Sequence, residues 1–514
     1  MHRLSGFTGV AALVSKILFM AVIDALLVWM FLSALAKHSG VIQLATVLIF
    51  CIINYVYFAK KPVPLKFLTP GLILMVLFVL IPVLYTVSMS AFNFQTGNEV
   101  SKSEAIASIL SNGLTPDSKN TTYDMVLGTK NGELTALLTN PATKQSFIGN
   151  AQGVVALAPG EFGAAANGDA ASVAGFKPYT ADQAANLGDQ INSLKMPLPG
   201  NVGVIEPQTE TSASLFTEEY VYNSKADTLT NTSTGVVYND NGDGNFALAS
   251  HPSTKIYPGW KAFNGFSNYL HLLDNPAVRG PFLGVFLWTF CFSIITVLMM
   301  FAVGLLLAIV LDQKLALKRF YRSVLILPYA IPSLMSILIW RGMFQTQFGA
   351  VNSLFHTHID FMDSPWFAKG IVLIVNLWLG FPYFYLISSG ALQSVPAELS
   401  EAAQIDGATS FQVLRRIKLP LVLQILSPLL IASFAFNFNN FNLIYLLTGG
   451  GPTDVLHGKF AGATDILITY TYKTAFNGNH QDFGSASAIS MVIFMIIGLV
   501  SLWSIRRSQV LENN

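Results

Sequence analysis

Long apolar runs alternate with polar segments along most of this chain. A helix needs about 20 mostly apolar residues to cross the hydrocarbon core of a bilayer. Eight runs meet that length, at about residues 16–36, 41–59, 70–92, 281–311, 323–344, 370–393, 420–447 and 484–505. The pattern predicts an all-α polytopic membrane protein with eight transmembrane helices.

Basic residues are concentrated in every second connection between these runs. They are Lys60, Lys61 and Lys66 before the third run, Lys314, Lys318, Arg319 and Arg322 before the fifth, Arg415, Arg416 and Lys418 before the seventh, and Arg506 and Arg507 after the eighth. Because Lys and Arg are enriched in short cytoplasmic loops, the pattern places these connections and both chain termini in the cytoplasm.

The long connection at residues 93–275 contains no arginine and is expected outside the cytoplasm. Its short Thr/Val/Tyr runs, punctuated by turns such as Asn131-Gly132, predict a β-rich domain. The segment 239–244 resembles a calcium loop, but Ser250 stands where the bidentate acid is needed, so a tight turn between strands is expected. The chain is thus divided into helices one to three at residues 1–92, the extracytoplasmic domain at 93–275, and helices four to eight at 276–514.

The first apolar run has a second interpretation, as a cleaved signal peptide, because Arg3 and Lys16 precede it and Ala34-Leu35-Ala36 ends it. Its length and the second run close behind it favour a retained helix. Asp24 lies inside this run, where a carboxylate is costly and by default suggests function. The sequence leaves open whether Asp24 serves a function, stays protonated or contacts the backbone of a neighbouring helix.

Composition agrees with a membrane protein, since 52% of the 514 residues are hydrophobic and only 11% are charged. A net charge of +1 gives no argument for nucleic acid as a partner. The chain has no G-x-x-x-x-G-K-[ST] motif, and Gly458-Lys459 lacks both the earlier glycine and the following Ser or Thr. No Cys/His cluster and no nucleophile–base–acid spacing is present. We therefore expect no metal, no cofactor bound by this chain and no catalysis.

The sixth and seventh runs carry polar residues in helical register. The two faces consist of Asn376, Gly380 and Tyr383 on the sixth run, about 60° wide, and Ser433, Phe436, Asn437 and Asn440 on the seventh, about 100° wide. The helices run antiparallel, and both faces lie roughly 10–20 Å below the outer surface at 1.5 Å per residue. The two faces are therefore level and could line one cavity.

The chemistry of these faces suits a neutral polyol. Amides and hydroxyls donate and accept hydrogen bonds, and the rings of Tyr383 and Phe436 offer flat apolar surfaces. The alternative is that the polar groups only hydrogen-bond one helix to another, as Ser and Asn do in membranes. That alternative better explains Asn439 and Asn442, which point to other faces of the seventh helix.

A polar segment at Glu401–Pro420 separates the sixth and seventh runs. Pro396 can open a helix, Gly407 permits a sharp redirection, and Pro420 sets where the next helix starts. We expect a compact helix–turn–helix on the cytoplasmic side. The alternative is a solvated amphipathic loop whose charges only keep it out of the bilayer.

This segment resembles the EAA loop of ABC importer permeases, which docks on an ATPase subunit. The coupling loop would span residues 394–420, and the residues that match are Glu401, Ala402, Ala403, Gly407, Ile417, Leu419 and Pro420.

From Thr69 onward, the chain resembles the larger transmembrane subunits of maltose/maltodextrin ABC importers (the MalF type). The matching segments are Leu325–Ile339, Leu377–Tyr383, Ile431–Asn440 and Leu446–Pro452, and the large insertion between the third and fourth helices is similar too. The resemblance implies an ABC importer type I permease core. It also implies that the sugar contacts are Asn376, Leu379, Gly380, Tyr383, Ser433, Phe436, Asn437 and Asn440.

The same resemblance implies partners and a location. The partners would be a homologous smaller permease subunit, two copies of a cytoplasmic ATPase that uses ATP and magnesium, and a periplasmic maltose/maltodextrin-binding protein. Membrane lipid would surround the helices, and the location would be the bacterial inner membrane, with the large domain in the periplasm.

Two other functions stay open at this point. A self-contained secondary sugar transporter would show internal repeats and, if proton-coupled, buried acids, of which Asp24 is the only convincing one. A membrane-anchored enzyme would need a catalytic constellation within residues 93–275, where His251 and His271 are the only histidines.

Overall fold

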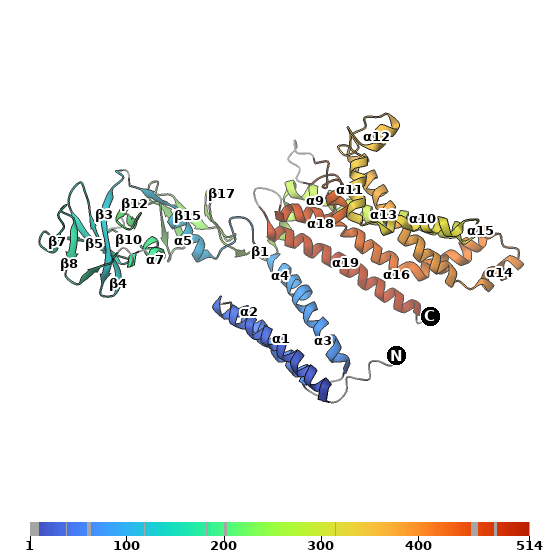
Figure 1. The fold of residues 1–514 in the computed structure, drawn as a ribbon. Helices are drawn as coiled ribbons and strands as arrows, with labels where there is room; N and C mark the ends of the chain where they lie inside the picture. Colours follow the sequence, from blue (N-terminus) through green and yellow to red (C-terminus); the bar gives the residue numbers. More distant parts are fainter. Residues whose placement is uncertain are drawn as a thin grey trace. The chain divides into compact units, whose positions relative to one another are not determined.

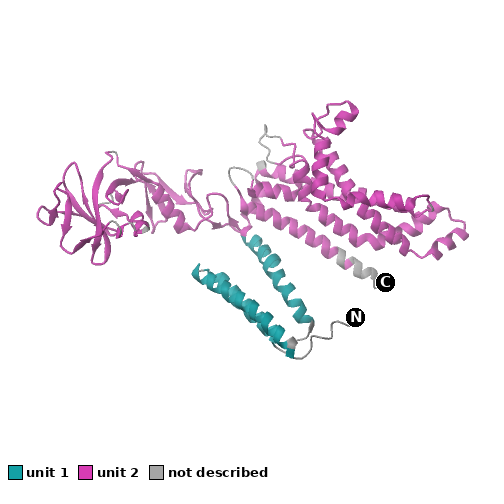
Figure 2. Cartoon of the chain, viewed as in Figure 1, with its two compact units in different colours: residues 1–88 teal, residues 89–514 magenta. Residues whose placement is uncertain are grey.

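The computed structural model describes residues 10–512 except 38, 59–62, 118, 181–182, 185, 200–202, 314, 454–460 and 477–480. Arg3, Lys60, Lys61, Lys314 and the Gly458-Lys459 pair therefore lie outside the described residues. The chain divides into two compact units, residues 1–88 and 89–514 (Figure 2). The three-part division expected from the sequence remains a prediction.

Seven helices in the described part of the chain are long and apolar enough to cross a membrane, or eight if one bent pair counts as a single span. Five of the seven spans each lie in a single helix: α1 (Val10–Ala36), α2 (Gly40–Phe58), α9 (Pro276–Asp312), α13 (Pro365–Ser394) and α19 (Phe483–Glu512) (Figure 1). One further span is the continuous run of α3 (Val63–Met75), η1 (Val76–Leu80) and α4 (Ile81–Met89). The last is the continuous run of α15 (Ser410–Val413), η2 (Leu414–Lys418) and α16 (Leu419–Phe438). The predicted all-α membrane architecture is confirmed.

The predicted fifth helix, 323–344, is not one straight helix. It consists of α10 (Lys318–Ala330) and α11 (Ser333–Met343), which meet at an angle of 91°. Pro332 has no N–H to donate and disfavours helical backbone at the residue before it, so Ile331 is extended at φ −85° and ψ 132°. The bend therefore follows from the proline.

The predicted seventh helix, 420–447, begins earlier and ends earlier than expected. Pro420 does not start it, because the helix runs on from Ser410 through a π-helical turn in which the Leu419 N–H donates to the Leu414 carbonyl. The helix stops at Phe438, and the short α17 (Phe441–Leu447) follows, with Asn440 as its N-cap.

The membrane helices of residues 89–514 pack around α9 and α13. A Cβ on Gly304 of α9 would lie 2.6 Å from the backbone carbon of Phe384 on α13, so only glycine permits this approach. Further along the two helices, Phe292, Val372 and Val375 are buried together with Leu443 of α17. This close packing holds α13 and α17 in defined positions beside each other.

The unit of residues 1–88 contains a helical hairpin of α1 and α2. The Asn54 amide on α2 donates a hydrogen bond to the Asp24 carboxyl on α1 at 2.8 Å. The Lys16 ammonium also donates to the Tyr57 carbonyl at 2.6 Å. Asp24 therefore pairs with a neighbouring side chain, an arrangement that the sequence did not single out.

The region between α4 and α9 is rich in β-structure, as predicted. Its larger sheet has nine strands: β2 (Leu114–Pro116), β3 (Thr122–Lys130), β4 (Glu133–Thr139), β5 (Ser146–Asn150), β6 (Gly153–Leu157), β9 (Phe176–Pro178), β10 (Met196–Pro197), β11 (Val204–Pro207) and β12 (Ser212–Glu218). The path β10-β11-β12-β3-β4-β5-β6 is antiparallel throughout, and β2 and β9 pair beside it with β12 and β3.

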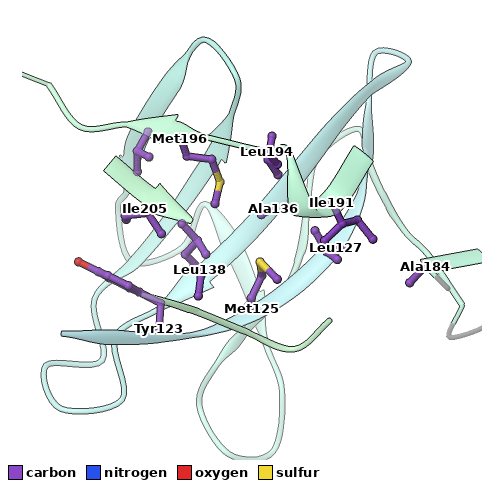
Figure 3. Packing of buried hydrophobic residues seen from close by; sticks show 12 residues of the cluster. Tyr123, Met125, Leu127, Ala136, Leu138, Ala184, Ile191, Leu194, Met196 and Ile205 are labelled. Atoms are coloured by element: carbon purple, nitrogen blue, oxygen red, sulfur yellow. The ribbon is translucent and has the colours of Figure 1, made fainter. Parts of the chain in front are cut away.

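The β3–β4 turn and the inner face of this sheet follow from the sequence. Asn131 and Gly132 have φ of 55° and 85°, the left-handed values that a tight hairpin turn requires. Met125, Leu138 and Ile205 pack in a buried cluster that also contains Ile191 of α7 (Gly188–Asn192) (Figure 3). This region therefore has a hydrophobic core of its own.

A second antiparallel sheet has five strands in sequential order: β13 (Tyr220–Asn223), β14 (Thr228–Asn231), β15 (Val237–Asp240), β16 (Phe246–Leu248) and β17 (His251–Ile256). Lys102, at the start of α5 (Lys102–Asn112), forms ion pairs with Asp227 and, at 2.6 Å, with Asp240. In the segment 239–244, the first two residues end β15 and residues 241–244 lie in the turn before β16, so a turn is present as predicted. The Lys102 ammonium is paired with Asp240, the carboxylate that a bound cation would need.

The remaining strands form two short pairs, β1 (Phe92–Asn93) with β18 (Ala262–Phe263), and β7 (Phe162–Ala164) with β8 (Ala170–Val173). The remaining helices are α8 (Ser267–Asp274), α12 (Ala350–Phe355), α14 (Ala397–Ile405) and α18 (Leu467–Phe476).

Candidate substrate cavity and coupling loop

A cavity of about 700 Å³ lies among α11, α13, α16 and α17 and the α10–α11 bend. All eight side chains or backbone positions expected at the sugar site line it: Asn376, Leu379, Gly380, Tyr383, Ser433, Phe436, Asn437 and Asn440. Within the described structure, none of the residues that line the cavity carries a charge. The wall is therefore neutral and combines polar groups with apolar ones.

A row of amides crosses the cavity wall from one helix to the other. Asn376 Nδ2 on α13 donates to Asn437 Oδ1 on α16 at 2.7 Å, and Asn437 Nδ2 donates to the Ser433 carbonyl at 2.8 Å. Asn440 Nδ2 approaches Asn376 Oδ1 at 3.4 Å. The two polar faces are thus level, and the same amides both join the helices and line the cavity.

The apolar part of the wall differs from the amide row in exposure. Asn376 and Asn437 are 3% and 2% exposed, whereas Phe436, which also lines the cavity, is 70% exposed. Tyr383 is half-buried and packs edge-on against Phe384 at 5.5 Å between ring centroids. Phe436 and Tyr383 therefore offer aromatic surface beside a wall of amides.

Gly380 brings α9 close to this wall. A Cβ at Gly380 would collide with the Sδ and Cε atoms of Met300 on α9, so the missing side chain leaves room for that methionine. Leu379 lies beside it on α13 and is half-buried. Both positions shape the cavity through packing, without supplying a polar group.

Besides Met300, Ile337, Phe384, Ala432 and Leu443, two parts of the cavity wall were not among the residues expected from the sequence. The first is the segment at the α10–α11 bend, from Pro328 to Ser333, where Tyr329 is 57% exposed. Pro328 and Pro332 were the available signal, because a bend in a membrane helix uncovers its backbone.

The second is Asn442, whose expected position away from the cavity is wrong. Asn442 lines the cavity, because the helix breaks at Asn439 and Asn440 and α17 starts in a new register. The expectation that Asn440 lies within one continuous helix is also wrong, because Asn440 is the N-cap of α17. Its side chain still reaches the cavity. Asn439 is not among the lining residues.

The expected helix–turn–helix is present at the coupling loop. Pro396 is the N-cap of α14, and Gly407 ends that helix in a left-handed conformation with φ +84°. The Ala408 N–H donates to the Ala403 carbonyl at 2.9 Å, and the Gly407 N–H donates to the Gln404 carbonyl at 3.0 Å. This pair of bonds is a Schellman motif, which explains why glycine is needed there.

The next helix also begins with a specific cap. Thr409 and Gln412 form a reciprocal capping box at the start of α15. In this loop Glu401, Ala402, Gly407 and Pro420 are exposed, and Ala403, Ile417 and Leu419 are half-buried. Ile405 is 86% exposed and Phe411 is 68% exposed, so the loop presents apolar side chains beside its charges. Such a surface suits a protein partner.

A buried ion pair organises the connection that follows α17. The Lys473 ammonium lies 2.7 Å from Asp465 Oδ2, and Asp465 is fully buried. Asp465 also accepts hydrogen bonds from the Gly462 N–H at 2.7 Å and the Thr469 hydroxyl at 2.9 Å. Burial raises the pKa of the Asp465 carboxyl, and the Lys473 ammonium opposes that shift. A Cβ on Gly450 would collide with this carboxyl, so the pair holds the glycine-rich turn closely.

A multi-pass helical bundle around a neutral cavity is the architecture of a membrane permease. Residues 300–509 match the family "Binding-protein-dependent transport system inner membrane component". Residues 73–152 match "N-terminal of TM subunit in PBP-dependent ABC transporters". These two matches cover both the helical core and the start of the β-rich region.

Full-length relatives are similar over nearly the whole chain. The "Maltose/maltodextrin transport system permease protein MalF" of Klebsiella aerogenes is 33% identical over 488 residues, covering 92% of each chain. The protein of that name from Escherichia coli (strain K12) is 34% identical over 471 residues, covering 88% of this chain and 89% of the relative. A solved bacterial ABC transporter involved in the import of the acidic polysaccharide alginate is 21% identical with a TM-score of 0.41, covering 48% of this chain and 83% of that one.

This chain belongs to the family of MalF permease proteins. It is a transmembrane subunit of an ABC importer and is not itself an enzyme, because ATP hydrolysis in such importers belongs to a separate subunit. The alternative of a self-contained secondary transporter is not supported.

Proposed function

We propose that this chain forms the translocation path and the binding site for maltose and maltodextrins in its importer. The supporting observation is the neutral cavity, in which an amide row stands beside the exposed ring of Phe436. Amides and the Tyr383 hydroxyl can exchange hydrogen bonds with sugar hydroxyls, and aromatic faces can cover the apolar face of a sugar ring. The names of the full-length relatives agree with this substrate class.

The binding residues in this proposal are the eight lining positions already described, together with Asn442. The first eight have distinct parts. Asn376, Asn437 and Asn440 present the amide row, Ser433 and Tyr383 supply hydroxyls, Phe436 supplies the stacking surface, and Leu379 and Gly380 shape the wall. No charged group lines the described cavity, so a neutral substrate is not penalised by burying an unpaired charge.

The coupling residues in this proposal are Glu401, Ala402, Ala403, Gly407, Ile417, Leu419 and Pro420. Their helical hairpin would dock on a cytoplasmic ATPase, using exposed Ile405 and Phe411 as apolar contacts and Glu401 as a charged one. ATP and magnesium would be bound by that partner, and this chain would hold no cofactor.

The full assembly in this proposal contains a homologous smaller permease subunit, two ATPase copies and a periplasmic binding protein that delivers the sugar. The chain would lie in the bacterial inner membrane with both termini in the cytoplasm. The region between α4 and α9 would lie in the periplasm, which is supported by the basic residues in the alternate short connections, since the orientation rule does not count a loop of this length.

Reconstitution of the assembled importer in proteoliposomes tests this function. With ATP on the ATPase side and binding protein on the other, we expect uptake of radiolabelled maltose that stops when ATP or the binding protein is omitted. Phe436→Ala should lower that uptake, whereas Phe348→Ala, which removes a ring that is 83% exposed and outside the cavity, should not. Uptake that needs no ATP, or absence of maltose uptake by an assembled importer, would refute the proposal.

A further inference from the structure

Aromatic side chains continue from the cavity along α17 and α18. Phe441 and Tyr445 of α17 stack at 4.9 Å between ring centroids with planes 16° apart. Tyr472 of α18 lies edge-on to both, at 5.1 Å from Phe441 and 5.4 Å from Tyr445, and Phe476 lies 5.2 Å further on. These four residues form one contiguous group of rings, which we call the aromatic cluster.

The aromatic cluster begins where the cavity ends. Asn442 lines the cavity, and Tyr445 follows it by three residues on the same helix. Three residues correspond to about 300° of rotation and about 4.5 Å of rise, so Tyr445 lies about 60° around the helix and almost one turn beyond Asn442. Both side chains are exposed, Tyr445 at 41%. The exposed face of α17 therefore leads from the cavity to the cluster.

The cluster also has polar edges. Tyr445 and Tyr472 each carry a hydroxyl, and the neighbouring Tyr445 side chain raises the pKa of Tyr472. Lys473, which follows Tyr472 in the sequence, is held by buried Asp465 and is only slightly exposed. A neutral surface with flat apolar faces and hydroxyls at its rim has the same chemistry as the cavity wall.

We propose that Asn442, Tyr445 and Tyr472 form an outer subsite for glucosyl units of a maltodextrin whose end occupies the cavity. This inference rests on the proposed sugar transport. Asn442 hydrogen-bonds the first glucosyl unit beyond the cavity. Tyr445 and Tyr472 offer ring surface to the following unit, and Phe441 stacks on Tyr445. The subsite therefore contributes to the import of longer chains more than to that of maltose.

The test compares two substrates in the reconstituted importer, maltose and maltohexaose, at concentrations below their half-saturation values. Tyr445→Ala is expected to lower maltohexaose uptake about three- to tenfold more than maltose uptake, which corresponds to the loss of one aromatic contact. Asn442→Ala should shift the ratio in the same direction. Tyr445→Phe keeps the ring and should retain most of the preference.

Two further variants separate the subsite from other roles of exposed aromatics. An aromatic residue at a membrane interface can be replaced by another apolar one with modest effect, so Tyr445→Leu should preserve maltohexaose uptake if the cluster only contacts lipid. The subsite predicts that Tyr445→Leu behaves like Tyr445→Ala. Phe355→Ala, which removes a ring that is 68% exposed and not part of the cavity, should leave the ratio of the two uptakes unchanged.

The outcomes distinguish a failure of the proposed function from a failure of the subsite alone. If the unaltered importer takes up neither sugar, the proposed function fails and the subsite fails with it. If it takes up both, and Tyr445→Ala changes them equally or changes neither, only the subsite is refuted. The subsite is also refuted if Tyr445→Leu restores the normal ratio.

Discussion

Asn376 and Asn437 face each other across α13 and α16, with 2.7 Å between the donor nitrogen of the first and the acceptor oxygen of the second. Both side chains are almost completely buried, and both line the cavity. The bond therefore ties two membrane helices together at the level at which a sugar would sit. Under the proposed function, sugar binding and helix packing share these residues, so a single substitution should perturb both.

The Asn376–Asn437 bond leads to a prediction about stability. Asn376→Ala and Asn437→Ala should each lower the free energy of unfolding by about 1–2 kcal/mol, because each leaves a buried amide with an unpaired group. The double variant should lose less than the sum of the two. Thermal denaturation of the purified assembly measures all three, and additive losses would show that the two amides do not interact.

Phe436, unlike Asn376 and Asn437, should affect sugar uptake but not stability. Its ring is 70% exposed, so Phe436→Ala should change the free energy of unfolding by less than about 0.5 kcal/mol while lowering maltose uptake several-fold. Phe436→Tyr keeps the ring and should retain most uptake. Initial uptake rates, normalised to the amount of protein in the membrane, provide the measurement. A large loss of membrane protein in Phe436→Ala would contradict this separation.

Gly407 should be sensitive to substitution for a reason of backbone conformation. Gly407→Ala should cost about 1–2 kcal/mol locally, because an L residue is strained at φ +84°, although no atom lies within 4 Å of the added Cβ. Gly407→Asn should cost less, since asparagine tolerates this conformation better. We expect sugar-stimulated ATP hydrolysis to fall in Gly407→Ala and partly recover in Gly407→Asn.

The matched control for Gly407 is Gly390 in α13, where an added Cβ would also have no atom within 4 Å but the backbone is ordinary helix. Gly390→Ala should be neutral or slightly stabilising. Equal losses in Gly407→Ala and Gly390→Ala would show that the positive φ is not the cause.

Glu401 should matter through its charge. It is exposed on α14, so Glu401→Lys should leave folding and membrane insertion intact and uncouple ATP hydrolysis from uptake, because a reversed charge is repelled by a partner surface that the carboxylate would attract. Glu401→Gln, which only removes the charge, should have a weaker effect. Parallel assays of ATP hydrolysis and sugar uptake test this, and normal uptake in Glu401→Lys would contradict the docking role.

The buried pair of Asp465 and Lys473 should be strongly coupled. Lys473→Met should lower the free energy of unfolding by about 3–5 kcal/mol, because it leaves a carboxyl without its cation in a fully buried position. The double variant Asp465→Asn with Lys473→Met should recover much of this loss. Denaturation midpoints of the purified assembly would show the recovery, and a double variant as unstable as Lys473→Met would indicate that the carboxyl is stabilised by its other donors.

Local features were predictable because each depends on only a few neighbouring residues. A bilayer requires long apolar helices, so the spanning segments could be located from hydrophobicity alone. The left-handed conformation at Gly407 and the turn at Asn131-Gly132 follow from what backbone each residue permits. Within the uninterrupted helix α16, the shared face of Ser433 and Asn437 follows from the helical repeat.

Only the tertiary structure decided where that repeat stops. The break at Asn439 and Asn440 moved Asn442 into the cavity wall, because periodicity assigns faces correctly only along a continuous helix. The side-by-side arrangement of β3 and β12, about 90 residues apart, likewise depends on the packing of a shared core. The sequence by itself determined which segments cross the membrane and which residue types could meet a sugar. Long-range packing determined which of those residues lie together, since no local preference encodes it.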